Sequence, residues 1–359
     1  MKYFCFLLII LFCFSCSKSL EEKCFIQKEE ENIYTEEKPF TAQQILESKP
    51  DYLEVIILKN YRSFKQDSIE RNNNFYDEKL AELKREKKKE EYKDFKKNFA
   101  DQFSCSHKQR IGNSEYCLGE NNLGYWLLKI ENNKPSAYFL GLSFSHYYFN
   151  EIQEKPIIND GFLELEGSLV KIVKIAGLPG YDDYSAIADG KLFKIKLEDL
   201  IKDSDSDGYN DIFENGFGLN PDTKDSDADG IDDFKDLNPM FKSEKNKFTQ
   251  LYEMLLPDYG DEKLRDYSYF FEVFKSDCDY FHQINPKYHV LFVPEDLNSQ
   301  PNYVKITDVS RHGIDKIKRN KNNPDIFYIK QWGSSSMKEY SAEYKDGKWI
   351  LEIGGGFVI

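Results

Sequence analysis

Apolar and polar residues alternate most clearly between positions 124 and 200. Four segments there are rich in β-branched and aromatic residues and are separated by Asn, Pro and Gly turns: YWLLKI, SAYFLGLSFSHYYF, FLELEGSLVKIVKI and KLFKIKLEDL. In FLELEG the apolar residues fall on every second position, which is typical of an antiparallel sheet with one face exposed to water. We therefore predict an antiparallel, strand-rich domain over residues 105–200.

The region before this domain has a helical spacing of apolar residues. Thr41 can cap a helix that contains Ile45 and Leu46, and a second apolar stretch covers residues 52–61. A long charged helix should follow, with a narrow apolar stripe that packs on the next domain; the stripe is Leu80, Leu83, Tyr92, Phe95, Phe99 and Phe103. The KREKKKEE run within it is interpreted as a solvated helix face. We predict a helical region over residues 41–104.

The C-terminal part repeats the strand signals after one helix. Residues 242–256 predict a helix that ends at Pro257, and EYSAEY and KWILEI flank an Asp346-Gly347 turn, the strongest hairpin signal in the chain. The fold class is therefore α+β: N-terminal helices, an antiparallel strand-rich half, a loop-rich acidic segment at residues 201–240, and a second strand-rich half, the α+β region at residues 241–359.

The N-terminus carries a targeting signal. Its apolar run, residues 3–14, is about half of what a membrane span needs, and Ser15 then precedes Cys16. The layout resembles a bacterial lipoprotein signal, although Cys13 and Phe14 replace the usual Leu and small residue. The resemblance implies a signal peptide at residues 1–15 and a lipid such as palmitate on Cys16. An ordinary secretory signal with an incidental cysteine is the alternative.

The residues after Cys16 fit a membrane-anchored protein. Residues 16–40 are polar and rich in Glu and Lys, as expected of a tether. Ser17, rather than Asp, favours the outer membrane over the inner one. We expect a lipid-anchored protein of the bacterial cell envelope, at the outer membrane, on its periplasmic face or at the cell surface.

Cleavage of the signal would leave four cysteines besides Cys16 in an oxidising compartment: Cys24, Cys105, Cys117 and Cys278. A possible disulfide joins Cys105 and Cys117 and would contribute about 3 kcal/mol if unstrained. The alternative is four separate, buried thiols. None of the spacings is the C-x-x-C of a zinc site.

Negative charge is concentrated in one segment of this 359-residue chain. The net charge is -14, and residues 203–236 hold twelve Asp or Glu against two Lys, so about -4 remains for all other residues. The chain therefore has neither a general acidic surface nor the basic face that nucleic-acid binding requires.

The acidic segment contains a twelve-residue cation-binding pattern, DSDSDGYNDIFE. Calcium is a hard cation that takes six to eight oxygen ligands, and a glycine at position six allows the tight turn that brings alternate side chains together. Gly208 stands at that position. The predicted ligands are Asp203, Asp205, Asp207, the carbonyl of Tyr209, Asp211 directly or through water, and Glu214 in bidentate fashion.

The pattern recurs 22 residues later as DSDADGIDDFKD, with Gly230 at position six. Its predicted ligands are Asp225, Asp227, Asp229, the carbonyl of Ile231, Asp233 and Asp236. Asp236 is shorter than the bidentate glutamate of the first loop, so the second site should be weaker or different in geometry. The sequence predicts two Ca²⁺ sites.

Ten residues between the loops leave no room for the helices of paired EF-hands. The segment instead resembles the bacterial thrombospondin type 3 repeat, in which D-x-D-x-D-G-x-x-D units alternate with Asn-Pro turns, here Asn220-Pro221 and Asn238-Pro239. The resemblance covers about a tenth of the chain and lacks the cysteines of the animal repeats. It implies calcium binding and an envelope or extracellular location, and no catalytic activity.

No catalytic motif is complete in the sequence. Arg311-His312-Gly313 starts like the histidine phosphatase signature but does not continue it, and the segment GLSFS at residues 141–145 lacks the last glycine of a nucleophile elbow and is interpreted as a strand. Residues 354–356 (GGG) are interpreted as a bend between terminal strands. We favour a non-enzymatic protein that binds or scaffolds an unknown protein or glycan at the envelope; an envelope hydrolase with structural calcium is the alternative.

Overall fold

The structure of the protein is a computed structural model. It describes residues 40–73, 78–174, 182–256, 267, 269–274, 282–294, 312–314, 317–333 and 336–358. The predicted signal peptide, Cys16, Cys24 and Cys278 lie outside these residues. Within them, no helix is both long and apolar enough to cross a membrane.

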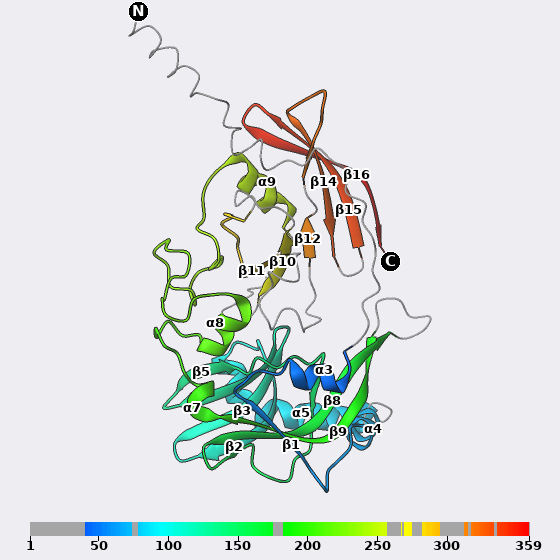
Figure 1. The fold of residues 1–359 in the computed structure, drawn as a ribbon, viewed down its shortest axis with the longest axis vertical. Coiled ribbons are helices and arrows are strands. Elements are labelled where there is room, and N and C mark those ends of the chain that lie inside the picture. The colour runs from blue at the N-terminus through cyan, green and yellow to red at the C-terminus, as the bar shows by residue number, and fades with distance from the viewer. Residues whose placement is uncertain are drawn as a thin grey trace, which may run out of the picture.

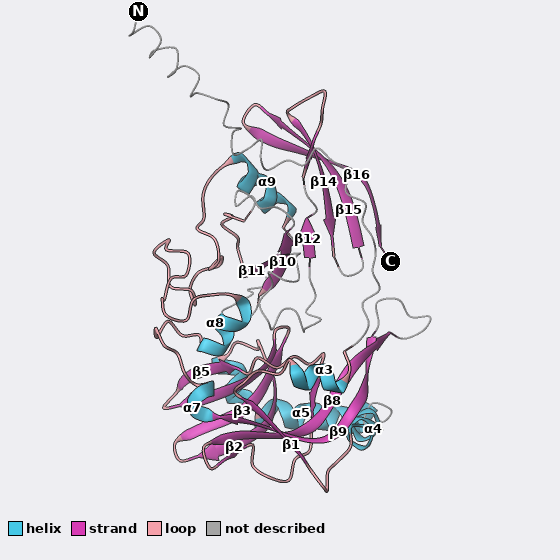
Figure 2. Ribbon diagram, viewed as in Figure 1, coloured by secondary structure: helices cyan, strands magenta, loops and turns pink. Residues whose placement is uncertain are grey.

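The fold is α+β, as the sequence predicts, and its strands form three sheets (Figures 1 and 2). One is an antiparallel meander in the order β2-β3-β4-β5, and its strands are β2 (Ser104–Ile111), β3 (Ser114–Asn121), β4 (Gly124–Glu131) and β5 (Lys134–Phe139). Tight turns join the strands, and Asn132 and Asn133 adopt left-handed conformations between β4 and β5. The predicted strand YWLLKI lies in β4, which is almost entirely buried.

A second antiparallel sheet packs in the same half of the molecule. Its order is β1-β9-β8-β6, with β7 also paired to β8. The strands are β1 (Leu53–Ile57), β6 (Tyr147–Phe149), β7 (Ile158–Asn159), β8 (Phe162–Lys174) and β9 (Asp182–Lys196). The predicted strand FLELEGSLVKIVKI is confirmed as far as Lys174, the last described residue of this segment. Of the predicted strand KLFKIKLEDL, KLFKIK is confirmed, whereas LEDL forms the short helix α7 (Leu197–Leu200).

Two other sequence predictions in this half of the molecule are wrong. The apolar stretch at residues 52–61, expected in the helical region, contains the strand β1. Leu53–Ile57 pairs with the last residues of β9, and this pairing buries the Leu53 side chain. Residues 141–145, expected in a strand, form the connection between β5 and β6. Leu142 and Ser143 are buried there, so the apolar residues of this segment serve the core without a strand partner.

Short helices cover this half. They are α3 (Ala42–Glu47), α4 (Phe64–Asn73), α5 (Glu78–Glu91), α6 (Lys93–Asn98) and α7 (Leu197–Leu200). Thr41 caps α3 with a complete capping box, as predicted. The apolar stripe is only partly buried. Tyr92, Phe95, Phe99 and Phe103 lie in the core, whereas Leu80 and Leu83 are exposed on α5, which has no buried residue. The prediction therefore holds from Tyr92 onward and is wrong for α5.

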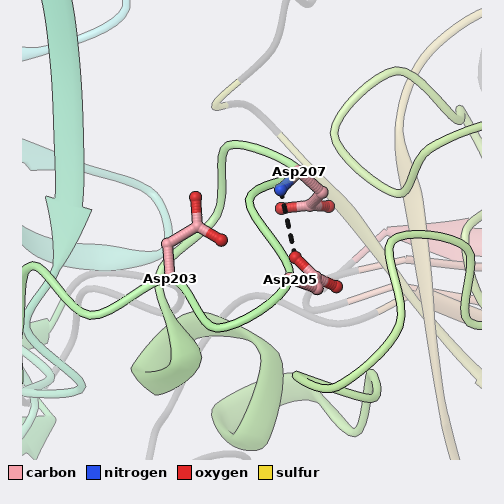
Figure 3. A group of neighbouring side chains, drawn as sticks. All are labelled: Asp203, Asp205 and Asp207. Carbon is pink, nitrogen blue, oxygen red and sulfur yellow. Dashed lines mark hydrogen bonds between the residues drawn. The ribbon is translucent and has the colours of Figure 1, made fainter.

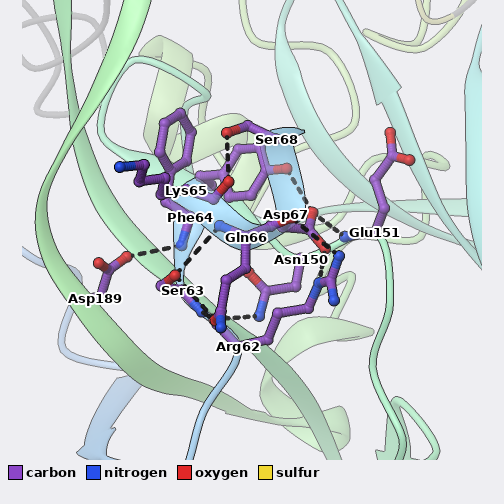
Figure 4. Close-up of polar contacts among 11 residues, drawn as sticks. Arg62, Ser63, Phe64, Lys65, Gln66, Asp67, Ser68, Asn150, Glu151 and Asp189 are labelled. Carbon is purple, nitrogen blue, oxygen red and sulfur yellow. Dashed lines mark hydrogen bonds and ion pairs between the residues drawn. The ribbon is translucent and has the colours of Figure 1, made fainter. Parts of the chain in front are cut away.

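A buried aspartate fastens α4 to the second sheet (Figure 4). Asp67 accepts hydrogen bonds from Arg62 Nε (2.5 Å), Tyr148 Oη (2.6 Å) and the Glu151 backbone N–H (2.9 Å). Asp189 of β9 accepts from the Phe64 N–H at the start of the helix. Because Asp67 is 2% exposed, its charge needs these donors, and the cluster has a structural role.

The third sheet, in the C-terminal half, has the order β11-β10-β12-β14-β15-β16, with β13 paired to β14. Its strands are β10 (Phe270–Phe274), β11 (Val290–Pro294), β12 (His312–Ile314), β13 (Lys318–Arg319), β14 (Ile326–Trp332), β15 (Ser336–Lys345) and β16 (Lys348–Val358). The sheet is mixed, since β10 runs parallel to both β11 and β12. The predicted Asp346-Gly347 hairpin is confirmed between β15 and β16.

Two further expectations in this half need correction. The helix predicted over residues 242–256 is α9 (Lys247–Leu255), which starts later because Asn246 provides the capping box. The glycines at residues 354–356 lie within β16 and do not form a bend between strands. A register shift at this point leaves Gly354 without an opposite residue, so a β-bulge takes the place of the expected bend.

Two hydrophobic cores result, and the chain crosses between them. One is built around β4 and contains Trp126, Phe139 and Phe213; the other lies between α9 and the third sheet. Tyr267 and Tyr269, which precede β10, belong to the first core. Their carbonyls accept hydrogen bonds from side chains of the first half, with Asn121 Nδ2 on Tyr267 (2.6 Å) and Asn122 Nδ2 on Tyr269 (2.9 Å).

Candidate metal centre

The two acidic loops fold in the same way. Position four of each loop, Ser206 or Ala228, has a left-handed φ of 64° or 61°, and the glycine at position six has a φ of 125° in Gly208 and 99° in Gly230. A residue that carries a side chain is strained at such positive φ angles, both at position four and at position six. A Cβ on Gly208 would also lie 3.2 Å from the ring of Phe234. The glycine requirement inferred from the sequence is therefore met in both loops.

The carboxylates themselves shape each turn. In the first loop, Asp205 accepts from the Asp207 N–H (3.0 Å) and Asp207 from the Tyr209 N–H (2.7 Å). The second loop repeats both bonds, from the Asp229 N–H to Asp227 (3.0 Å) and from the Ile231 N–H to Asp229 (2.9 Å). These bonds hold alternate side chains on the inner side of the turn.

Three groups of carboxylates have oxygen atoms within 4.8 Å of one another and could hold a metal ion. Two of them are the expected clusters, Asp203 with Asp205 and Asp207 (Figure 3) and Asp225 with Asp227 and Asp229. The third combines Asp207 and Glu214 of the first loop with Asp233 of the second. The structure thus brings together eight of the ten predicted carboxylate ligands and leaves Asp211 and Asp236 outside these groups.

Glu214 is the most unusual carboxylate of the centre. It lies in the first turn of α8 (Asp211–Phe217), is 0% exposed, and neither of its oxygens has a hydrogen-bond partner among the described residues. Burial, together with the charges of Asp205 and Asp207, raises its pKa to about 9. Two carboxylates at 4.8 Å repel by about 3 kcal/mol at an effective dielectric constant of about 20, so these groups require a counter-charge when ionised.

Burial also perturbs the neighbouring aspartates. It raises the pKa of Asp207 to about 6, that of Asp227 to about 7 and that of Asp233 to about 6. Asp205 and Asp227 each keep one buried oxygen that has no hydrogen-bond partner in the described part of the chain. A cation would supply the missing partner to Asp205 and Asp227, and a counter-charge to Asp207 and Asp233.

The two residues outside the clusters have other partners. Asp211 accepts from the Ser204 N–H (2.8 Å) and from Lys202 Nζ (2.6 Å), and hydrogen bonds from Lys202 and Ser204 lower its pKa despite partial burial. Asp236 accepts from the Asn238 N–H (2.9 Å), and burial raises its pKa. The two residues with predicted carbonyl ligands differ in exposure: Tyr209 is buried, whereas Ile231 is 44% exposed.

The first loop is anchored in the first core. The Tyr209 ring stacks on Phe213 at 4.1 Å, and its hydroxyl is hydrogen-bonded to that of Tyr269. Asn210 is buried and bonds both backbone groups of Phe139 and the carbonyl of Leu200 (2.8 Å). The metal centre therefore rests directly on β5 and on the segment that leads into β10.

The second loop leads into the C-terminal half. Asn238 Nδ2 donates to the carbonyls of His282 (2.8 Å) and Ile284 (3.1 Å), and the Val290 N–H donates to the carbonyl of Leu237 (2.8 Å). The Asn-Pro turn expected from the sequence is thus a point of attachment between the loops and the third sheet.

The cysteines and the partial motifs lie elsewhere. Cys105 on β2 and Cys117 on β3 are both buried, and burial raises the pKa of Cys117. Both are free thiols in the structure, so the disulfide stays a prediction. His312 lies in β12, whereas Arg311 is outside the described residues.

Sequence reasoning missed two functional contacts. One is the Asn210 side chain, which bonds to Phe139 and Leu200 and makes no capping hydrogen bond to α8, so the capping preference of Asn before a helix does not predict it. The approach of Asp233 to the first loop depends on how the two loops pack, and no local pattern reports it. The spacing of the sequence pattern predicts Asp233 as a ligand of the second site alone.

In comparisons with known proteins, the chain matches no family model, no curated protein and no solved structure.

Proposed function

We propose that this protein is a calcium-binding lipoprotein of the bacterial envelope, in which two bound Ca²⁺ ions order the central loops. The observation that carries the proposal is Glu214, a buried carboxylate with no hydrogen-bond partner among the described residues, set among other carboxylates. A buried charge needs a counter-charge. The carboxylates grouped with Glu214 are themselves acidic and cannot supply it, which favours a bound cation as its source.

The chemistry of the groups favours calcium over other metals. Every clustered side chain offers oxygen, whereas zinc sites are rich in His and Cys ligands. Calcium accepts six to eight oxygens in flexible geometry, while magnesium demands a near-ideal octahedron and keeps several waters. A centre with many carboxylates on turning backbone therefore suits Ca²⁺ better than Mg²⁺.

The position of the centre suggests what calcium does. The first loop is fixed to the first core through Tyr209 and Asn210, and the second to the C-terminal half through Asn238. Calcium would hold these attachments in one arrangement and present the two halves as a rigid surface. We infer a non-enzymatic binding or scaffolding role, with an unknown protein or glycan as partner and a lipid on Cys16 as the membrane anchor.

Calorimetry and thermal melts of the mature protein test the proposal. We expect calcium binding with a Kd of about 0.1–1 mM, and stabilisation of about 2.7 kcal/mol per site at a hundred times Kd. Magnesium at equal concentration should stabilise much less. A melt unchanged by EDTA, with no heat of calcium binding at millimolar concentration, would remove the proposal.

A further inference from the structure

The two loops differ at position nine, although the local bonding is otherwise alike. Asp211 accepts from Ser204 and also from Lys202 Nζ (2.6 Å), so an ammonium group neutralises it. Among the described residues, Asp233 accepts only from the Ser226 N–H (2.8 Å) and Oγ (2.6 Å).

The lysine equivalent to Lys202 is directed to the other loop. Lys224 Nζ donates to the Ser206 carbonyl of the first loop at 2.8 Å. It therefore binds the loops to each other, and no ammonium group of the described residues bonds to Asp233.

Asp233 instead faces the first loop. One of its oxygens lies within 4.8 Å of ligand oxygens of both Asp207 and Glu214. The adjacent residue, Phe234, donates its N–H to Asp207 Oδ2 (3.3 Å), and its ring lies over Tyr209 at 4.9 Å. These contacts hold Asp233 against Glu214, whose two oxygens are buried and unpartnered within the described residues.

We propose that the calcium ion bound by Glu214 is shared between the loops, with Asp207 and Glu214 as ligands from the first loop and Asp233 as a ligand from the second. This inference rests on the proposed function and refines it, because it moves Asp233 from the second site to the first. The first site is then complete only when both loops are folded. Calcium binding at Glu214 should therefore depend on the second loop even when the second loop binds no ion.

A calcium titration in a single-site background tests this dependence. The background is the full chain with Asp225→Asn and Asp227→Asn, which disables the second loop's own cluster. Adding Asp233→Asn should weaken the remaining binding at least tenfold. The matched control is Asp232→Asn, which removes the same charge from an adjacent residue that pairs with Lys235 and belongs to no metal group; it should change the binding less than threefold.

A double-mutant cycle locates the effect. If Asp233 and Glu214 hold one ion, Asp233→Asn should cause no further loss once Glu214→Gln is present. Remaining binding that is equal in the Asp233→Asn and Asp232→Asn variants would overturn the inference and leave the proposed function intact. Wild-type protein that binds no calcium would overturn both.

A structure of the wild-type protein soaked with Mn²⁺ or Tb³⁺ gives an answer that does not depend on how the variants fold. Anomalous scattering should place an ion within about 2.6 Å of oxygens of both Glu214 and Asp233. An ion on Glu214 that lies beyond coordination distance of Asp233 would contradict the inference.

Discussion

Glu214→Gln should have opposite effects on the protein with and without calcium. At pH 8 Glu214 is ionised in the unfolded chain. The metal-free fold must bury Glu214 either as the protonated acid or as a carboxylate without a counter-charge, and both states cost free energy of folding. The substitution removes the charge and keeps the shape. Metal-free protein should therefore become more stable, while the calcium-bound protein loses a ligand.

The expected magnitudes follow from burial. A buried polar group without a hydrogen bond costs about 1–3 kcal/mol, and more when charged. The amide of Gln still lacks partners, so we expect a gain of about 1 kcal/mol in the metal-free state, or about 2–4 °C in Tm. Loss of the ligand should raise Kd about tenfold, which lowers the stabilisation at a hundred times the wild-type Kd from about 2.7 to about 1.4 kcal/mol.

Paired melts in EDTA and in calcium measure both effects. Asp222→Asn is the matched control, because Asp222 is exposed, lies between the loops and belongs to none of the metal groups, yet its substitution removes the same charge. It should move neither melt by more than about 1 °C, since surface changes usually stay within about 0.5 kcal/mol. If Glu214→Gln and Asp222→Asn gave the same calcium-induced rise in Tm, Glu214 would not be a ligand.

Three other outcomes are expected. Asp207→Ala should weaken the first site more than Asp236→Ala weakens the second, because Asp207 belongs to two carboxylate groups and Asp236 to none; calorimetry on both variants decides this, and equal losses would contradict it. Burial raises the pKa of Asp207 and Asp227, so the metal-free fold should lose stability as pH rises from about 4 through about 7, above the unfolded pKa values. The difference in Tm between calcium and EDTA should then widen from pH 5 to pH 8, and a constant difference would exclude these groups. Cys16→Ala should abolish labelling by a fatty-acid analogue and release the protein from the detergent phase; labelling as strong as in wild type would rule out Cys16 as the anchor.

Local patterns in the sequence predicted the elements whose partners are close in the chain. The β15–β16 hairpin follows from Asp346-Gly347, which supplies the two left-handed residues of the turn. The acidic loops follow from residue spacing, since each turn is built by its own side chains within a few positions. In both the hairpin and the acidic loops, the residues that determine the local structure lie within about a dozen positions of one another.

Predictions failed where the structure depends on distant partners. The stretch Leu53–Ile57 is apolar enough for a helix or a strand, and its pairing with Lys191–Ile195 decides the outcome. Leu80 has the right spacing for a buried stripe but lies exposed on α5, a helix with no buried residue, and spacing alone does not report what a helix packs against. The approach of Asp233 to Asp207 and Glu214 likewise depends on how two loops pack, which the spacing within either loop does not report.

The hydrogen bond from Asn121 to the Tyr267 carbonyl bears on how the chain matures as it is made. It joins residues 146 positions apart, and the Tyr267 ring meets Trp126 in the first core. At about 5–20 residues per second, a ribosome needs about 7–30 s to add that stretch. During this interval the nascent first half exposes an aromatic surface that its own sequence cannot yet cover, so aggregation or chaperone capture should be most frequent in chains halted before Tyr267.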